Sequence, residues 1–205
     1  MLTIHHAPGT RGFRLIWLCE ELALPYALRK VDFSAEYRAS EQWRRMNPVG
    51  KVPVMSDGDF RMFESGAMVQ YLLERYAHGR LQPPCEDSAY GVFLQWCWFA
   101  EATFGRATGE IANHKRAFAA APRADAIEEM RERARACVRA LEPVLAGAQY
   151  LLGEPFTAAD VMMGYTLGSY GRHVADPLPD AVARYFARLQ ARAGYQRALA
   201  AERAM

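Results

Sequence analysis

The sequence lacks the features of several classes of protein, and each absence narrows what the chain does. Its four cysteines form no CxxC pair and show no metal-ligand spacing, which predicts reduced thiols and no metal site. No apolar run reaches the ~18 residues of a membrane span. No basic segment followed by an apolar stretch opens the chain, so no signal peptide is expected. These absences predict a cytoplasmic protein with no membrane partner.

The chain also lacks an excess of either positive or negative charge. The 205 residues carry 25 Lys and Arg against 23 Asp and Glu, a net charge of +2. Residues 1–78 hold 10 basic and 9 acidic side chains, and residues 79–205 hold 15 and 14. Neither part has the basic excess of a nucleic-acid-binding surface, so no nucleic-acid partner is expected. The hydrophobic content of 51% is enough for a sizeable core in one or two domains.

The two ends of the chain differ in their secondary-structure signals. Short strand and helix signals alternate up to about residue 78, with strands expected over 2–5 and 27–33, helices over 13–22 and 67–76, and a hairpin turn at Asp57-Gly58. Residues 34–46 show no clear pattern. Residues 79–88 contain a glycine and two prolines and predict a linker. Beyond them only helix signals occur, over 89–104, 127–145, 179–192 and 195–203.

One further helix start is marked by Thr157-Ala158-Ala159-Asp160 before an apolar run. In this capping-box pattern the threonine and the acidic side chain bond to each other's backbone N–H groups. We expect it to serve folding and not catalysis.

Two polar segments of the N-terminal part indicate a binding site. Residues 47–55 contain Pro53 between short β-branched stretches, which predicts a loop that enters an edge strand, because proline cannot donate to a sheet ladder. Glu64-Ser65 lies where a second strand ends and a helix begins, and such a helix N-terminus suits an anionic group. Together these features would suit a small peptide that carries a carboxylate.

Four segments in this order and spacing resemble the cytosolic glutathione S-transferases: residues 17–22, 47–55, 63–65 and 150–161. The resemblance implies an α+β, thioredoxin-like domain over 1–78, a linker over 79–88 and an all-α domain over 89–205. It also implies a homodimer, an active site at the domain junction, and a cis Val52–Pro53 bond. The sequence alone does not predict that bond, since only about 5–6% of X–Pro bonds are cis.

The resemblance assigns glutathione, as co-substrate, to particular residues. The backbone of Val52, next to Pro53, would pair with the cysteinyl part as an added strand. Glu64 and Ser65 would hold the γ-glutamyl end, and Lys51 would meet the glycine carboxylate. Each has an alternative: Glu64 and Ser65 could simply cap the following helix, and Lys51 could be a solvated charge.

The first loop departs from the family pattern at the residues that would activate the thiol. Family members place a serine, tyrosine or cysteine in the first loop, whereas this loop has no cysteine and has glycine at position 12. Thr10 is its only hydroxyl, and Arg11 and Arg14 add positive potential. Thr10 could instead cap the first helix, and Arg14 could pair with a carboxylate. His6, just upstream, could also reach the cleft.

The electrophile is expected against the first helix of the all-α domain, which is crowded with aromatic residues. Core packing is the alternative for each of them. The candidates for an apolar pocket are Tyr90, Phe93, Trp96, Phe104 and Tyr165.

The sequence thus predicts a transferase that uses glutathione to attack a small hydrophobic electrophile, with detoxification as its role. Glutathione-dependent isomerisation or peroxide reduction is one alternative, and a non-catalytic binding or regulatory module is another, because fold does not fix function.

Overall fold

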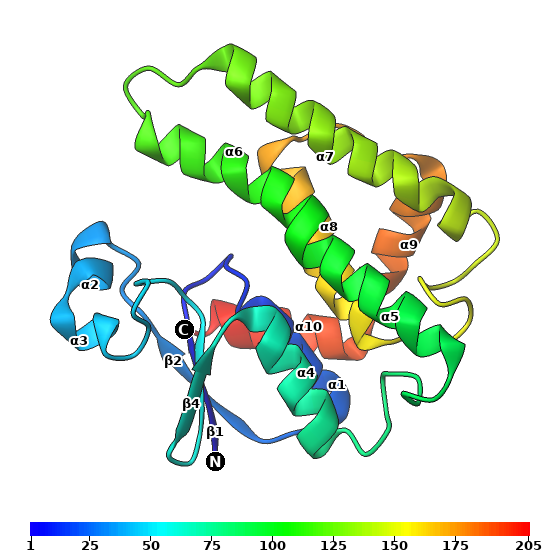
Figure 1. Ribbon diagram of the computed structural model, residues 1–205, viewed down its shortest axis with the longest axis horizontal. Coiled ribbons are helices and arrows are strands. Elements are labelled where there is room, and N and C mark those ends of the chain that lie inside the picture. The colour runs from blue at the N-terminus through cyan, green and yellow to red at the C-terminus, as the bar shows by residue number, and fades with distance from the viewer. The chain divides into compact units, whose positions relative to one another are not determined.

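The computed structural model describes all 205 residues, and its contacts divide them into two compact units (Figure 1). We call residues 1–80 together with 191–205 the N-terminal unit, and residues 81–190 the helical unit. The expected division at residue 78 placed everything beyond residue 88 in the second domain. In the structure, the last helix lies with the N-terminal unit.

The N-terminal unit is built on a mixed sheet with the order β2-β1-β3-β4. β1 runs parallel to β2 and antiparallel to β3, and β3 and β4 form a hairpin around Gly58. Its strands are β1 (Leu2–His6), β2 (Tyr26–Lys30), β3 (Val54–Asp57) and β4 (Phe60–Phe63). With α1 (Phe13–Leu22) between β1 and β2 and α4 (Ser65–Tyr76) after β4, this is a thioredoxin-like fold. The expected edge strand after Pro53 is wrong, because β3 lies between β1 and β4. An inner strand is possible here because Pro53 precedes the first paired residue, Val54, and needs no ladder bond.

The segment without a clear sequence pattern forms two short helices, α2 (Ala35–Ala39) and α3 (Glu41–Arg44). Each begins at a serine whose hydroxyl caps it: Ser34 accepts from the Tyr37 N–H at 3.1 Å, and Ser40 from the Trp43 N–H at 3.2 Å. A strand was predicted over residues 27–33, whereas β2 begins at Tyr26 and ends at Lys30.

The last helix, α10 (Ala193–Arg203), packs along α1 within the N-terminal unit (Figure 1). The Tyr195 ring meets Phe13 and Trp17 edge-on, with centroids 5.3 and 5.0 Å apart. Such edge-to-face pairs add to the free energy gained by burying the rings. The first and last helices of the chain therefore share one apolar contact.

The helical unit contains only helices among its regular elements, as predicted. Its α7 carries the predicted apolar stripe, and Ile127, Ala134 and Leu141 on that stripe are buried. None of the helices is both long and apolar enough to cross a membrane. The elements are α5 (Ser88–Trp98), a π-helical segment (Phe99–Phe104), α6 (Gly105–Ala117), α7 (Ala124–Leu145), α8 (Ala158–His173) and α9 (Asp180–Gln190).

The capping box is confirmed at the start of α8, where both of its reciprocal bonds are present. The fully buried Asp160 carboxylate accepts from the N–H of Thr157 at 2.8 Å, the N–H of Leu151 at 3.0 Å and the hydroxyl of Tyr185 at 2.8 Å. One side chain thus joins the helix start to the preceding loop and to α9.

Candidate active site

The strand register brings the predicted glutathione-binding segments to one end of the sheet. Val54, the first residue of β3, pairs with His5 of β1 and with Phe63 of β4. Val52 therefore lies just beyond both ladders, next to the residues that follow Phe63. The Val52–Pro53 bond is cis, as the resemblance implied. The Val52 backbone is thus placed where an extended peptide could pair with it.

The loop before this bond is held by Asn47, whose side chain is buried. Its carbonyl oxygen accepts from the Val49 N–H and its amide nitrogen donates to the Lys51 carbonyl, both at 3.0 Å. Lys51 itself is exposed. Asn47 was not among the predicted site residues, although its place in the Asn-Pro-Val-Gly turn is typical of a side chain that bonds to its own backbone.

Glu64 and Ser65 are arranged in opposite ways at the start of α4. Glu64 is exposed, has a φ of 76°, and makes no side-chain cap to the helix. Ser65 is buried, with 4% of its surface exposed. A non-glycine residue at positive φ costs about 1–3 kcal/mol, and such residues cluster at functional sites. Because the Glu64 side chain makes no cap bond to α4, the capping alternative for this residue is wrong. Its binding role stays a prediction.

Arg14 joins the first helix to this site. It is fully buried, and its Nη1 donates to Ser65 Oγ at 3.1 Å. The two residues lie 51 positions apart in the sequence, so no local pattern connects them. The bond holds the Ser65 hydroxyl in a fixed direction and brings a positive charge to the N-terminus of α4.

The first loop, residues 7–12, also follows β1 at this end of the sheet. The Thr10 hydroxyl donates to the Ala7 carbonyl at 2.7 Å and lies 3.2 Å from His6 Nδ1. The cap of α1 is Gly12, with no side-chain bond, so the alternative in which Thr10 caps that helix is wrong. Arg11 is half-buried. The positive end of α1 faces back toward this loop.

His6 is a residue of this region that the sequence placed only loosely. It is fully buried at the end of β1, and its Nε2 lies 2.7 Å from Glu202 of α10. A Cβ atom on Gly12 would lie only 2.3 Å from His6 Nδ1, which explains why this position has no side chain. No sequence signal connects His6 with Glu202, since 196 positions separate them.

The aromatic residues predicted for the electrophile pocket fall into two groups. Phe93, Trp96 and Phe104 are buried, with at most 7% of each exposed, and this agrees with the core alternative stated for them. Phe104, for example, packs edge-on against Tyr170 at 5.9 Å. Tyr90 and Tyr165 are half-buried. These two therefore stay the better candidates for a pocket.

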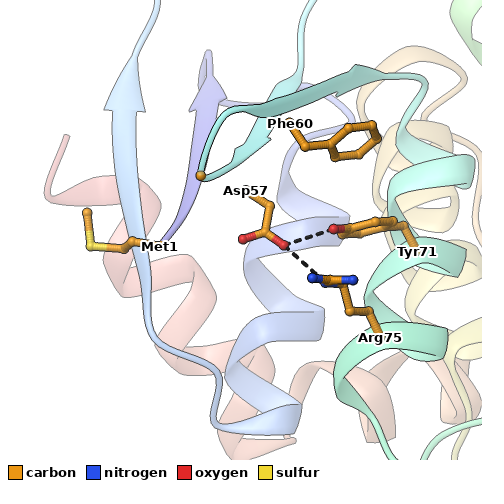
Figure 2. A pocket seen from close by; sticks show the side chains of 6 residues that line it. Met1, Asp57, Phe60, Tyr71 and Arg75 are labelled. Atoms are coloured by element: carbon orange, nitrogen blue, oxygen red, sulfur yellow. Dashed lines mark hydrogen bonds and ion pairs between the residues drawn. The ribbon is translucent and has the colours of Figure 1, made fainter.

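A separate polar cluster lies beside the β3–β4 hairpin (Figure 2). There Asp57 accepts hydrogen bonds from Tyr71, at 2.8 Å, and from Tyr76, and it pairs with Arg75 at 3.5 Å. The Tyr76 hydroxyl is the main cause that holds the pKa of Asp57 below its usual range. Phe60 stacks on Tyr71 and is half exposed. The sequence had indicated only a turn at Asp57.

Comparison with known proteins adds independent support. The family model for the glutathione S-transferase N-terminal domain matches residues 1–74, and that for the C-terminal domain matches residues 124–188. Glutathione S-transferase 3 of Schizosaccharomyces pombe is 31% identical over 104 residues, which are 50% of this chain and 42% of that protein. A glutathione S-transferase of Hyoscyamus muticus is 26% identical over 194 residues, 91% of each chain.

Solved structures resemble the chain over nearly its whole length. A glutathione S-transferase from Actinobacillus pleuropneumoniae is 26% identical with a TM-score of 0.82, over 99% of this chain and 93% of that one. A glutathione transferase family member from Pseudomonas fluorescens, with two glutathione molecules bound, is 25% identical with a TM-score of 0.84, over 97% and 92%. Both halves of the chain thus match one family, and the chain belongs to the glutathione S-transferases.

Proposed function

We propose that the chain is a glutathione transferase that activates the glutathione thiol for attack on a small hydrophobic electrophile. The observation that carries this proposal is the register at Val54, which brings Val52, Ser65 and the first loop to one end of the sheet. A binding strand, an anion site and a hydroxyl-bearing loop in one place are what a bound, ionised glutathione requires.

The proposed binding roles follow from the local chemistry. The Val52 N–H and C=O would pair with the cysteinyl residue. The Ser65 hydroxyl and the first N–H groups of α4 would take the γ-glutamyl carboxylate, with Arg14 behind them. Glu64 would accept from the ammonium group, and the exposed Lys51 would meet the glycine carboxylate.

Activation requires the thiolate to be stabilised relative to the thiol. A free thiol has a pKa of about 8.5, and lowering it by about two units takes about 2.7 kcal/mol. Thr10 could supply part of this by turning its proton from the Ala7 carbonyl to the sulfur. The half-buried Arg11 and the positive end of α1 would supply the rest.

The thiolate would then attack an electrophilic carbon, forming a carbon–sulfur bond while a leaving group departs or an adjacent double bond takes up the electron pair. We assign the electrophile to the helical unit, where Tyr90 and Tyr165 are partly accessible. Their rings with polar tips suit a hydrophobic molecule that also accepts a hydrogen bond.

One observation favours a second candidate, a binding module without catalysis. The single proton of Thr10 already has two acceptors within the chain, the Ala7 carbonyl and His6 Nδ1. If glutathione cannot draw that proton away, the site would bind the peptide without ionising its thiol.

We also propose that the protein is a homodimer located in the cytoplasm. Each unit exposes large apolar side chains that a second copy could cover. In the N-terminal unit these are Phe60, 50% exposed, and Phe63, 38% exposed, and in the helical unit Trp98, 58% exposed. Analytical ultracentrifugation of the protein and of Phe60→Ser tests this: the variant should dissociate at higher concentrations than the natural chain.

The function is tested by titrating the protein with glutathione near pH 7 while recording the ultraviolet thiolate band and, separately, the heat of binding. A saturable band supports the transferase. Heat without a band supports the binding module, and neither signal overturns both. Ser65→Ala should weaken binding about tenfold, about 1.4 kcal/mol, with the thiol pKa nearly unchanged. Thr103→Ala, an exposed change in the helical unit, serves as the control.

A further inference from the structure

The last helix is fastened to the first helix independently of any contact with the first loop. Arg192 Nε and Nη2 each donate to the Glu21 carboxylate at 2.8 Å, a two-pronged ion pair just before α10 begins. Further along, Arg197 Nε donates to Glu20 at 2.8 Å. With the Tyr195 ring contacts, these bonds hold α10 along α1 (Figure 1). The position of the end of α10 is therefore set by these ion pairs and ring contacts with α1.

At that end, Glu202 reaches the first loop. Its Oε1 accepts from the Gly9 N–H at 3.0 Å and lies 2.7 Å from His6 Nε2. The first contact is to the backbone of the loop itself, at a glycine with a φ of 76°. The second is to a fully buried ring. One carboxylate thus contacts both the strand end and the tip of the turn that carries Thr10.

The contact with His6 fixes the direction of the ring. A carboxylate only accepts hydrogen bonds, so the proton on this side of the ring sits on Nε2. Nδ1 then faces the loop, 3.2 Å from Thr10 Oγ1, and packs where a Cβ on Gly12 would otherwise be. A ring turned over or tilted would change what the Thr10 hydroxyl meets.

We infer that Glu202 is a positioning residue for thiol activation: from the last helix it holds His6 and Gly9, and through them it sets the orientation of the Thr10 hydroxyl. This inference rests on the proposed function, since it concerns the same loop. Glu202 acts through other groups and does not itself touch glutathione. Its effect should therefore be seen in the ionisation of the bound thiol and not in the binding of the peptide.

Three variants test the inference. Glu202→Ala removes both contacts. Glu202→Gln keeps an acceptor oxygen for Gly9 and His6 but loses the charge. Arg197→Ala loosens α10 without touching the loop and is the matched control, since it removes the ion pair with Glu20. The pKa of the bound thiol is read from the thiolate band against pH, and binding from calorimetry with S-methylglutathione, which has no ionisable thiol.

We expect Glu202→Ala to raise the pKa of the bound thiol by about one unit with affinity for S-methylglutathione within about twofold. Glu202→Gln should restore the natural value, and Arg197→Ala should leave it in place. The inference is overturned if Glu202→Ala leaves the thiol pKa unchanged, if Arg197→Ala shifts it equally, or if Glu202→Gln fails as badly as Glu202→Ala.

A second readout separates this inference from the proposed function. Nitrogen-edited NMR of the protein without glutathione should show a slowly exchanging Nε2–H on His6 in the natural chain and in Glu202→Gln, and lose it in Glu202→Ala. If the natural chain shows this proton but never a thiolate band, the proposed function fails while the hold of Glu202 on His6 stands. If the proton is equally present in Glu202→Ala, the positioning role fails even where the transferase activity is real.

Discussion

Thr10 and Thr157 both lie shortly before a helix, yet only the Thr157 hydroxyl caps the helix that follows it. Thr157 is the N-cap of α8 and exchanges bonds with Asp160 three residues later. Thr10 precedes α1 by three positions, with Gly12 in the N-cap position, and its hydroxyl turns back to the Ala7 carbonyl. A hydroxyl caps a helix only from the N-cap position, from which it reaches the first free N–H groups, and a hydroxyl outside that position is available to contacts from elsewhere in the chain.

The largest effect is expected from Asp160→Ala, which removes the acidic partner of Thr157 at the start of α8. The change removes a buried acceptor and leaves the Tyr185 hydroxyl and two backbone N–H groups without it. We expect a loss of about 3 kcal/mol or more in the free energy of unfolding, measured by urea denaturation. A loss below about 1 kcal/mol would mean that water or a neighbouring group replaces the carboxylate easily.

A second large effect is expected in the first loop from Gly12→Ala. Gly12 has a φ of −62°, so an alanine adopts the backbone without strain, and any cost comes from the contact with His6. We expect a loss of about 1–3 kcal/mol in thermal or urea unfolding. Gly91→Ala is the control: no atom lies within 4 Å of its Cβ position in α5, and this change should be neutral or slightly stabilising.

The two threonines themselves give the direct comparison. Thr157→Ala should cost about 1 kcal/mol of stability and leave the pKa of the bound thiol alone. Thr10→Val should do the reverse, with a nearly unchanged unfolding curve and a raised thiol pKa. Both are read from urea denaturation and from the pH dependence of the thiolate band. If Thr10→Val leaves the pH profile in place, Arg11 or the backbone is the activator.

The smallest expected effect compares two aspartates that accept from tyrosines. Asp57 lies near the surface, where the Tyr76 and Tyr71 hydroxyls lower its pKa, whereas Asp160 is fully buried. A lowered folded pKa gives stability that is present above the unfolded value of about 3.9 and is lost as the pH falls through the folded value. The natural chain should therefore lose slightly more stability than Asp57→Asn between pH 5 and pH 2. Equal losses would show that Asp57 contributes nothing.

Much of the fold could be predicted from patterns of residues that lie close together in the sequence. The stripe of α7, the Thr157–Asp160 box and the turn at Gly58 all depend on residues within a few positions of one another, and each was predicted. The helices α2 and α3 were missed because they span about one turn each, too short for a period to show. Their only signals were Ser34 and Ser40, which cap them.

The site was less predictable because its parts meet through the sheet. The cis bond at Pro53 followed from the family resemblance and from no feature of the residues. The bond from Arg14 to Ser65 and the contact of Glu202 with His6 join positions 51 and 196 residues apart. Side-chain patterns repeat over a few residues, so contacts of this kind become visible only when the strands are paired.

The discontinuity of the N-terminal unit has a consequence for how the protein is made. Residues 1–80 leave the ribosome well before residues 191–205, and the whole helical unit is synthesised in between. Until α10 arrives, the Phe13 and Trp17 rings lack the Tyr195 ring that covers them. The nascent chain therefore exposes the apolar surface of these two rings through most of its synthesis, and chaperones bind surfaces of this kind. Because residues 81–190 are inserted in the sequence between the two parts of the N-terminal unit, the segment that is synthesised first completes its folding last.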